Sequence, residues 1–391
     1  MSARTRFIVL VVTAPILAFV IVGGIAGRTS ARAETYQHLR VFEDVVSLIS
    51  SNYVEPANMT RVMRGALRGL ADGLDADSAY LPPEEAKIYQ SGQKLPAGET
   101  GIELTRLYYL RAIAVRDGSP AAKAGIQTGD FVRAIDDKPT RDMSIYEGRR
   151  RLAGAPGTTV RLLVIRGNVA DPHEVTLTRE ASAAPAVTGR IEQDQIGYVR
   201  LAAFGPDTAK AVSARIGELT RSGATSLLVD VRNSATGSYE SGIAAARLFI
   251  PRGTLAYRQA HGAARQAIDA VAGDGAVTLP AVVLVDAGTS GAAEVFAAAL
   301  AGNNRARLVG ERTQGRAALQ QTTPLPDGAV MVISTTWFLT PSGDPIHEKG
   351  LAPAVPVEVP DVDFGAPPPA ADAILQKAIE LIRTKDGTRK Q

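Results

Sequence analysis

The stretch between positions 281 and 321 holds the residues best placed to do chemistry in this chain. An apolar run, Ala281 to Val285, leads into a small-residue turn, Asp286 to Gly291. A helical pattern follows with four apolar residues on one face, Val295, Phe296, Ala299 and Leu300. A strand, a turn and a helix place a reacting group well, because N–H groups at a helix N-terminus stabilise developing negative charge. The loop of residues 310–321 is expected to return a second group toward the turn.

This stretch resembles the catalytic segment of the C-terminal processing peptidases, tail-specific serine proteases of the S41 type with a Ser/Lys dyad. Aligning the family's Glu on Glu294 places its nucleophile at Gly291. Aligning the family's Thr-x-Gly on Thr313 and Gly315 places its base at Arg316. The two alignments agree, because the separation of positions 291 and 316 is that of the family's Ser and Lys. Neither catalytic residue is present.

These two replacements predict a chemically inactive dyad. Glycine offers no nucleophile, and Arg316 cannot be deprotonated to act as a general base. Gln320 does match the Gln that supports the base in the family. The alternative is that Ser290 acts as a displaced nucleophile, with His261 or His347 as a substitute base. We favour inactivity, because a misplacement of about 1 Å can cost roughly a hundredfold in rate.

A second part of the resemblance concerns the oxyanion hole. The run of residues 227–233, LLVDVRN, resembles the family's strand that ends in Arg-Asn-Asn-Pro-Gly-Gly, where backbone N–H groups help to build that hole. Here the family's Pro is Ala235 and one glycine of the pair is Thr236. The oxyanion-hole region that the resemblance implies comprises Thr236, Gly237 and Ala292, and these changes put its function in doubt.

Residues 98–182 resemble a PDZ domain. The runs GSPAAKAG (residues 118–125) and GDFVRAID (residues 129–136) match that family closely. The family's carboxylate-binding loop and peptide-pairing strand fall on four residues, Gly101, Ile102, Glu103 and Leu104. The resemblance implies that an extended peptide adds to this strand and that backbone N–H groups hold its terminal carboxylate. The alternative is a packing module that binds no peptide, since residues 105–109 lack glycine.

The composition excludes several kinds of site. The chain has 391 residues with 43 basic and 40 acidic side chains, and this near balance gives no nucleic-acid signature. It has no cysteine, which removes disulfides, thiol nucleophiles and thiolate zinc sites. The four histidines, His38, His173, His261 and His347, show no metal-ligand spacing. We therefore expect neither a metal nor a cofactor.

The N-terminus is predicted to direct export. Arg4 and Arg6 precede a largely apolar run over residues 7–27, which is long enough to span a bilayer with its positive end in the cytoplasm. Residues 31–33, ARA, also fit a small-x-small cleavage site, so a removable signal peptide competes with an uncleaved anchor. In either case we expect the remainder in the cell envelope, periplasmic or anchored in the inner membrane by residues 7–27.

The fold class that these patterns predict is α/β. Strand and helix patterns alternate after residue 187, which indicates a mixed sheet with covering helices. The resemblance implies a ClpP/crotonase-like core with an inserted-type PDZ domain, and the run LDADSAYL (residues 74–81) also matches the family. The predicted parts are a signal peptide or anchor (1–33), an N-terminal helical region (34–95), the PDZ domain (98–182), an S41-type peptidase-like core (187–359), and a Pro-rich linker with a C-terminal helix (360–391).

Three functions remain open from the sequence. The preferred one is a proteolytically inactive family member that binds C-terminal tails or unfolded polypeptide segments, as an adaptor or as a regulator of an active peptidase relative. The second is an active serine endopeptidase based on Ser290. The third is a structural envelope protein with a closed PDZ groove. The first is favoured because nucleophile, base and one oxyanion-hole glycine all differ, whereas distant packing motifs fit. Membrane contact is expected through the N-terminal segment, and no nucleic-acid partner is expected.

Overall fold

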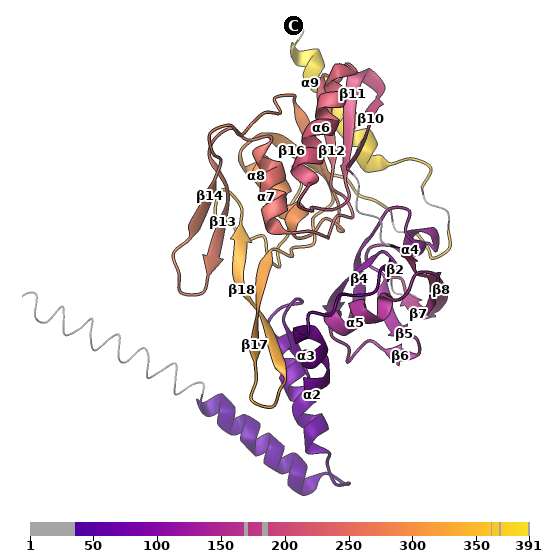
Figure 1. The fold of residues 1–391 in the computed structure, drawn as a ribbon, viewed down its shortest axis with the longest axis vertical. Coiled ribbons are helices and arrows are strands. Elements are labelled where there is room, and N and C mark those ends of the chain that lie inside the picture. Colours follow the sequence, from indigo (N-terminus) through magenta and orange to yellow (C-terminus); the bar gives the residue numbers. More distant parts are fainter. Residues whose placement is uncertain (1–35, 168–170, 182–186, 361, 367–368, 390–391) are drawn as a thin grey trace, which may run out of the picture. The chain divides into compact units, whose positions relative to one another are not determined.

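A computed structural model describes residues 36–389 apart from 168–170, 182–186, 361 and 367–368 (Figure 1). The chain divides into two compact units, residues 1–67 and 68–391. In the first unit, the helix of residues 36–52 keeps much of its apolar pattern exposed, including Leu39 and Val45. The predicted signal peptide or anchor lies outside the described residues. Within the described ranges, no helix is both long enough and apolar enough to cross a membrane.

The second unit contains a six-stranded sheet in the order β10-β11-β12-β15-β16-β19. Its strands are β10 (Val187–Glu192), β11 (Ile196–Leu201), β12 (Ser226–Asp230), β15 (Ala281–Val285), β16 (Ala306–Gly310) and β19 (Val355–Pro356). From β11 to β19 all neighbours run parallel, whereas β10, joined to β11 by a short 3-10 turn (Gln193–Gln195), is antiparallel. The predicted mixed α/β sheet is therefore confirmed.

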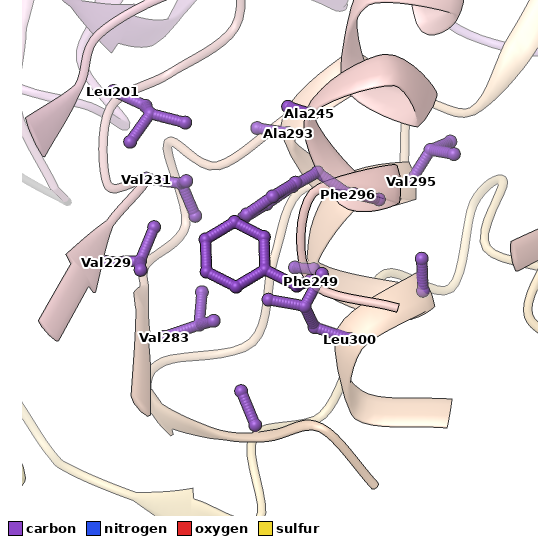
Figure 2. Close-up of a cluster of buried hydrophobic side chains, with 14 of the residues drawn as sticks. Leu201, Val229, Val231, Ala245, Phe249, Val283, Ala293, Val295, Phe296 and Leu300 are labelled. Carbon is purple, nitrogen blue, oxygen red and sulfur yellow. The ribbon is translucent and has the colours of Figure 1, made fainter. Parts of the chain in front are cut away.

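Helices cover both faces of this sheet. One face packs against α6 (Thr208–Arg221), α7 (Tyr239–Arg247) and α8 (Ala292–Gly302). Figure 2 shows Phe296 of α8 with Phe249 beside Val229 and Val283 of the sheet. The alternate residues of the same strands, Leu228 and Leu284, face α9 (Ala373–Arg389). Burial on both faces explains why these strands read as continuous apolar runs.

A second sheet stands beside the core, in the order β1-β18-β13-β14 with β17 paired to β18. Its strands are β1 (Ala79–Leu81), β13 (Thr254–Ala260), β14 (Gln266–Asp269), β17 (Ala318–Pro324) and β18 (Val330–Leu339). The predicted loop of residues 310–321 is thus too long, because β17 already begins at Ala318 and its ladder with β18 supplies the hydrogen bonds of that segment. β1 joins the segment around residue 80 to this sheet.

The predicted PDZ domain forms a sheet of its own in the order β3-β4-β5-β7-β8, with β6 paired to β5. Its elements are β2 (Gly98–Glu99), β3 (Ile102–Leu107), β4 (Tyr109–Val115), α4 (Pro120–Lys123), β5 (Phe131–Ile135), β6 (Lys138–Pro139), α5 (Ile145–Leu152), β7 (Thr159–Ile165), β8 (His173–Thr178) and β9 (Glu180–Ala181). β2 pairs with β9, and Leu104, Val132 and Leu162 belong to a separate hydrophobic core. β3 lies at the edge of the sheet, as peptide addition requires.

An acidic contact joins α3 (Pro83–Gln90) to α5 of the PDZ domain. The carboxylate of Glu85 accepts a hydrogen bond from the Ser144 hydroxyl at 2.8 Å, and the same hydroxyl accepts the N–H of Glu147 at 3.0 Å. Glu147 in turn pairs with Arg151. Burial raises the pKa of Glu85 to about 7, and the nearby Glu147 carboxylate acts in the same direction.

This raised pKa predicts a pH-dependent stability. The protonated Glu85 carboxyl contributes stability that is present below about pH 4.5 and is lost as the pH rises through about 7. Glu85→Gln should therefore unfold at higher urea than the natural chain at about pH 8, and its unfolding free energy should fall less between about pH 5 and 7. Glu174→Gln, at an exposed carboxylate of β8, is the control. Parallel pH curves for the natural chain and Glu85→Gln would contradict the assignment.

Candidate active site

The carboxylate of Glu294 joins the two segments that the sequence predicted to meet. Glu294 lies in the first turn of α8 and is fully buried. Its Oε2 accepts the N–H of Gly291 at 3.0 Å and that of Arg316 at 2.8 Å. Its Oε1 accepts the Gly315 N–H at 2.6 Å and the hydroxyl of Thr313. Burial raises the pKa of Glu294, but these four donors oppose that shift because they favour the charged form.

Further hydrogen bonds fix the loop of residues 313–316 on its other sides. The Thr313 hydroxyl accepts the Leu351 N–H at 2.7 Å, and the Gln314 N–H donates to the Thr289 carbonyl at 3.0 Å. A Cβ atom on Gly315 would lie 2.8 Å from the backbone nitrogen of Gly350, so only glycine fits this close approach. The loop therefore has one defined position against the turn before α8.

Gly291 adopts a backbone conformation that favours glycine. It precedes α8 with φ 64° and ψ −118°, where L-residues with a side chain are strained. A Cβ atom built on Gly291 would meet no atom closer than the Arg316 carbonyl oxygen, at 3.7 Å. Positions 291 and 316 are thus adjacent. There is room for a side chain at position 291, and the backbone conformation alone opposes it.

Arg316 is held as an ion pair. Its Nη2 lies 2.6 Å from Oδ1 of Asp77, and both side chains are largely buried. Burial disfavours the charge of Arg316, but Asp77 outweighs this, so the pKa of Arg316 is raised above its ordinary value. The hydroxyl of Tyr239 donates to the Arg316 carbonyl at 3.1 Å. The position of the family's base therefore carries a permanent cation.

Gln320 lies further along, on β17. Its side-chain amide donates to the Ala318 carbonyl at 2.9 Å and to the Ser334 hydroxyl at 3.3 Å. These contacts hold the amide along β17 and β18. The support of a base at position 316 by Gln320 stays a prediction.

The region predicted for the oxyanion hole forms a turn beside the α8 N-terminus. The Ser290 N–H donates to the Ser234 carbonyl at 2.9 Å, which joins the turn to the residues before α8. The Thr236 carbonyl accepts the N–H of Phe204 at 2.9 Å. A Cβ atom on Gly237 would lie 2.1 Å from the Phe204 carbonyl oxygen, so glycine is required there. Ala292 is the first residue of α8, where an N–H has no intrahelical acceptor.

The displaced-nucleophile alternative requires a base beside Ser290. Ser290 is buried, and among the described residues its hydroxyl has no hydrogen-bond partner. His261 lies exposed after β13. His347 is buried, with its Nε2 3.4 Å from Oδ2 of Asp75. Neither histidine contacts the Ser290 hydroxyl in this arrangement. In the described part of the chain, no three His, Asp or Glu side chains are grouped so that they could hold a metal ion.

A cleft of about 820 Å³ connects the PDZ domain with the turn that carries Thr236 and Gly237, called here the oxyanion turn. It is lined by Gly101, Ile102 and Glu103, the first residues of the predicted peptide site. Thr236 and Gly237 line the same cleft from the core. Leu104 is instead fully buried and belongs to the PDZ core, so its side chain cannot contact a peptide. Of the predicted peptide-binding residues, Leu104 thus offers only backbone groups to a peptide.

Two charged contacts of the site were missed by sequence reasoning. Asp77 lies in a run that matches the family, but no spacing links it to Arg316, because β1 and β18 bring the two together from distant parts of the chain. Similarly, Arg149 of α5 pairs with Glu103 of β3 at 2.9 Å inside the cleft. In the sequence, the only sign of a role for Asp77 is that it is an acidic residue within a run that matches the family.

Family models match two parts of the chain. The model for peptidase family S41 matches residues 195–357, which contain both dyad positions and the oxyanion turn. A PDZ domain model matches residues 112–166.

Relatives over most of the chain are named as processing proteases. The chain is 34% identical over 277 residues to a carboxyl-terminal-processing protease of Synechocystis, covering 70% of this chain and 65% of that protein. It is 30% identical over 340 residues to a carboxy-terminal-processing protease of Bartonella bacilliformis, covering 85% of this chain and 78% of that protein. The chain thus spans just under two thirds of the Synechocystis relative's length.

A solved structure shares the fold. The photosystem II D1 C-terminal processing protease superposes with a TM-score of 0.68 at 27% sequence identity. The match covers 78% of this chain and 84% of that protein.

The hydrogen bonds of Glu294 generate a stability prediction. In Glu294→Gln the amide group must face either Gly291 and Arg316 or Gly315 and Thr313, so at least one buried N–H loses its acceptor. We expect the unfolding free energy to fall by about 3 kcal/mol in urea denaturation. Glu240→Gln, at an exposed carboxylate of α7, should change it by less than about 1 kcal/mol. Equal effects of the two substitutions would show that Glu294 does not stabilise the loop.

Proposed function

This chain belongs to peptidase family S41, the carboxyl-terminal-processing proteases, and from that premise we propose that it is a proteolytically inactive member that binds polypeptide tails. One observation carries the proposal. The two dyad positions are adjacent, yet one has no side chain and the other is an arginine paired with a buried carboxylate. A Ser/Lys mechanism needs a hydroxyl and a neutral amine, and neither group is available.

Peptide binding is supported by the groove of the PDZ domain. β3 is the edge strand of its sheet, so its outer backbone groups are available to an added strand. Gly101 has φ 83°, and its carbonyl accepts the Arg116 N–H at 2.8 Å, which fixes the loop before β3. The cleft beside this loop extends to Thr236 and Gly237. An extended tail held at the loop therefore lies along the way to the vestigial site.

The relatives support the proposed ligand, and the N-terminal sequence supports the proposed location. The chain's relatives are named for carboxyl-terminal processing, which makes polypeptide C-termini and unfolded segments the expected ligands. The basic flank and apolar run of residues 4–27 support a place in the cell envelope, either periplasmic or anchored in the inner membrane. There the chain acts as an adaptor for tails or as a regulator of an active relative.

The first test is proteolysis by the full-length chain. We expect an unfolded reporter protein to remain uncut, at a rate at least roughly 10⁴-fold below that of an active family member at equal concentration. Ser290→Ala should make no difference, because the Ser290 hydroxyl has no base beside it. Cleavage by the natural chain that Ser290→Ala abolishes would sink the proposal and establish the displaced nucleophile.

The second test is peptide binding by the same chain. A labelled peptide with a free C-terminal carboxylate should bind at least about tenfold more tightly than its amide, because charge-assisted hydrogen bonds to the carboxylate are lost in the amide. Gly101→Ala should remove this preference, since its Cβ atom would lie 2.2 Å from the Ser119 Cβ atom. Fluorescence anisotropy measures both affinities.

A matched control separates binding from backbone strain. Gly118 also has positive φ, 67°, but a Cβ atom there meets open space. Gly118→Ala should therefore keep the preference for the free carboxylate. Negligible binding of both peptides by the natural chain would instead support a structural envelope protein with a closed groove.

A further inference from the structure

Backbone hydrogen bonds fix both residues of the ion pair between Asp77 and Arg316. Asp75 accepts the N–H groups of Asp77 and Ser78 at 2.9 and 2.6 Å, which fixes the turn that carries Asp77. The strand that follows, β1, pairs with β18. Arg316 is held from its backbone by Glu294. The two side chains therefore meet between fixed backbones, and their Nη2–Oδ1 distance is 2.6 Å.

The other acidic groups near position 316 each have an interaction partner of their own. Glu103 pairs with Arg149 at 2.9 Å. Glu294 receives four hydrogen bonds, three of them from backbone N–H groups. The hydroxyl of Tyr239 is neutral and donates to backbone carbonyls, with burial raising its pKa. Asp77 is left as the counter-ion of Arg316.

We propose that Asp77 is a positioning residue that fixes position 316 as a cation, and so is a third residue that silences this site. The inference rests on the proposed absence of proteolysis. Its consequence is that restoring a serine at position 291 and a lysine at position 316 does not restore a general base. All three positions, 77, 291 and 316, must change together.

The physical reason is the charge state of an introduced lysine. A general base must be a neutral amine, and burial without a counter-ion favours that form. A carboxylate within about 4–6 Å favours the ammonium form instead and shifts a pKa by about 1–3 units. Asp77→Asn keeps the size and shape of the side chain and removes its charge. In that background the Asp77 carboxylate no longer opposes the effect of burial on the introduced amine.

The decisive experiment measures this charge state in the full-length chain. Lysines are labelled by reductive methylation with ¹³C, and the introduced amine is titrated by NMR in Gly291→Ser, Arg316→Lys, with and without Asp77→Asn. We expect Asp77→Asn to increase the neutral fraction of that amine at a given pH at least tenfold. Asp142→Asn, which removes an exposed carboxylate, should leave the titration unchanged. Equal titration curves with and without Asp77→Asn would overturn the inference.

A stability measurement gives a second readout that needs no activity. An amine whose pKa is lowered on folding loses stability as the pH falls through the window between its folded and unfolded pKa values. The triple variant should therefore gain unfolding free energy as the pH rises through that window up to about 10.4, the ordinary lysine pKa. The variant that keeps Asp77 should show no such gain. A gain of equal size in both would contradict the role of Asp77.

Cleavage of the unfolded reporter then distinguishes this inference from the proposed function. We expect the double variant to stay silent and the triple variant to cut. Equal cutting by the double and triple variants would overturn the role of Asp77 and leave the proposed function intact. Cutting by the natural chain would overturn the proposed function itself.

Discussion

A buried carboxylate must receive hydrogen bonds in the folded chain, and Glu294 receives four from two segments that are distant in sequence. This requirement sets the distance between the α8 turn and the loop of residues 313–316. Three of the donors are backbone N–H groups, which every residue except proline supplies. These hydrogen bonds therefore do not depend on which side chains stand at positions 291 and 316. Side chains other than the family's Ser and Lys can therefore stand at both positions while Glu294 keeps its hydrogen bonds.

The two replacements have opposite effects on the energy of the fold. At φ 64° a serine would store about 1–3 kcal/mol of backbone strain, and Gly291 removes that strain. At position 316 the change adds a cost, because a guanidinium cannot shed its proton when buried. Asp77 offsets this cost as a counter-ion. Loss of the nucleophile thus needs no compensation, whereas a buried arginine at the base position does.

The sequence predicts the local elements of this arrangement but not the contacts between segments that are distant in the chain. The strand, turn and helix of residues 281–302 follow from apolar periodicity and a small-residue turn, and they form as expected. The start of β17 at Ala318 and the contact of Asp77 with Arg316 do not follow, because both depend on pairing with β18. Single-sequence periodicity carries no information about which strands become neighbours. His347 shows the same limit, since it lies beside Asp75, a residue far from it in the sequence.

The strand predicted to pair with a peptide and the two dyad positions lie on different elements of this fold. A peptide added to β3 gains backbone hydrogen bonds that form equally in any bound state, so they contribute affinity without contributing to a reaction rate. The dyad positions lie instead on the α8 turn and the loop of residues 313–316, and their replacements alter no backbone group of β3. The cleft that joins the two regions is lined by Glu103 and Arg149, which pair with each other. The side chains at positions 291 and 316 can therefore change without altering the edge of β3 that the sequence predicts to pair with a peptide.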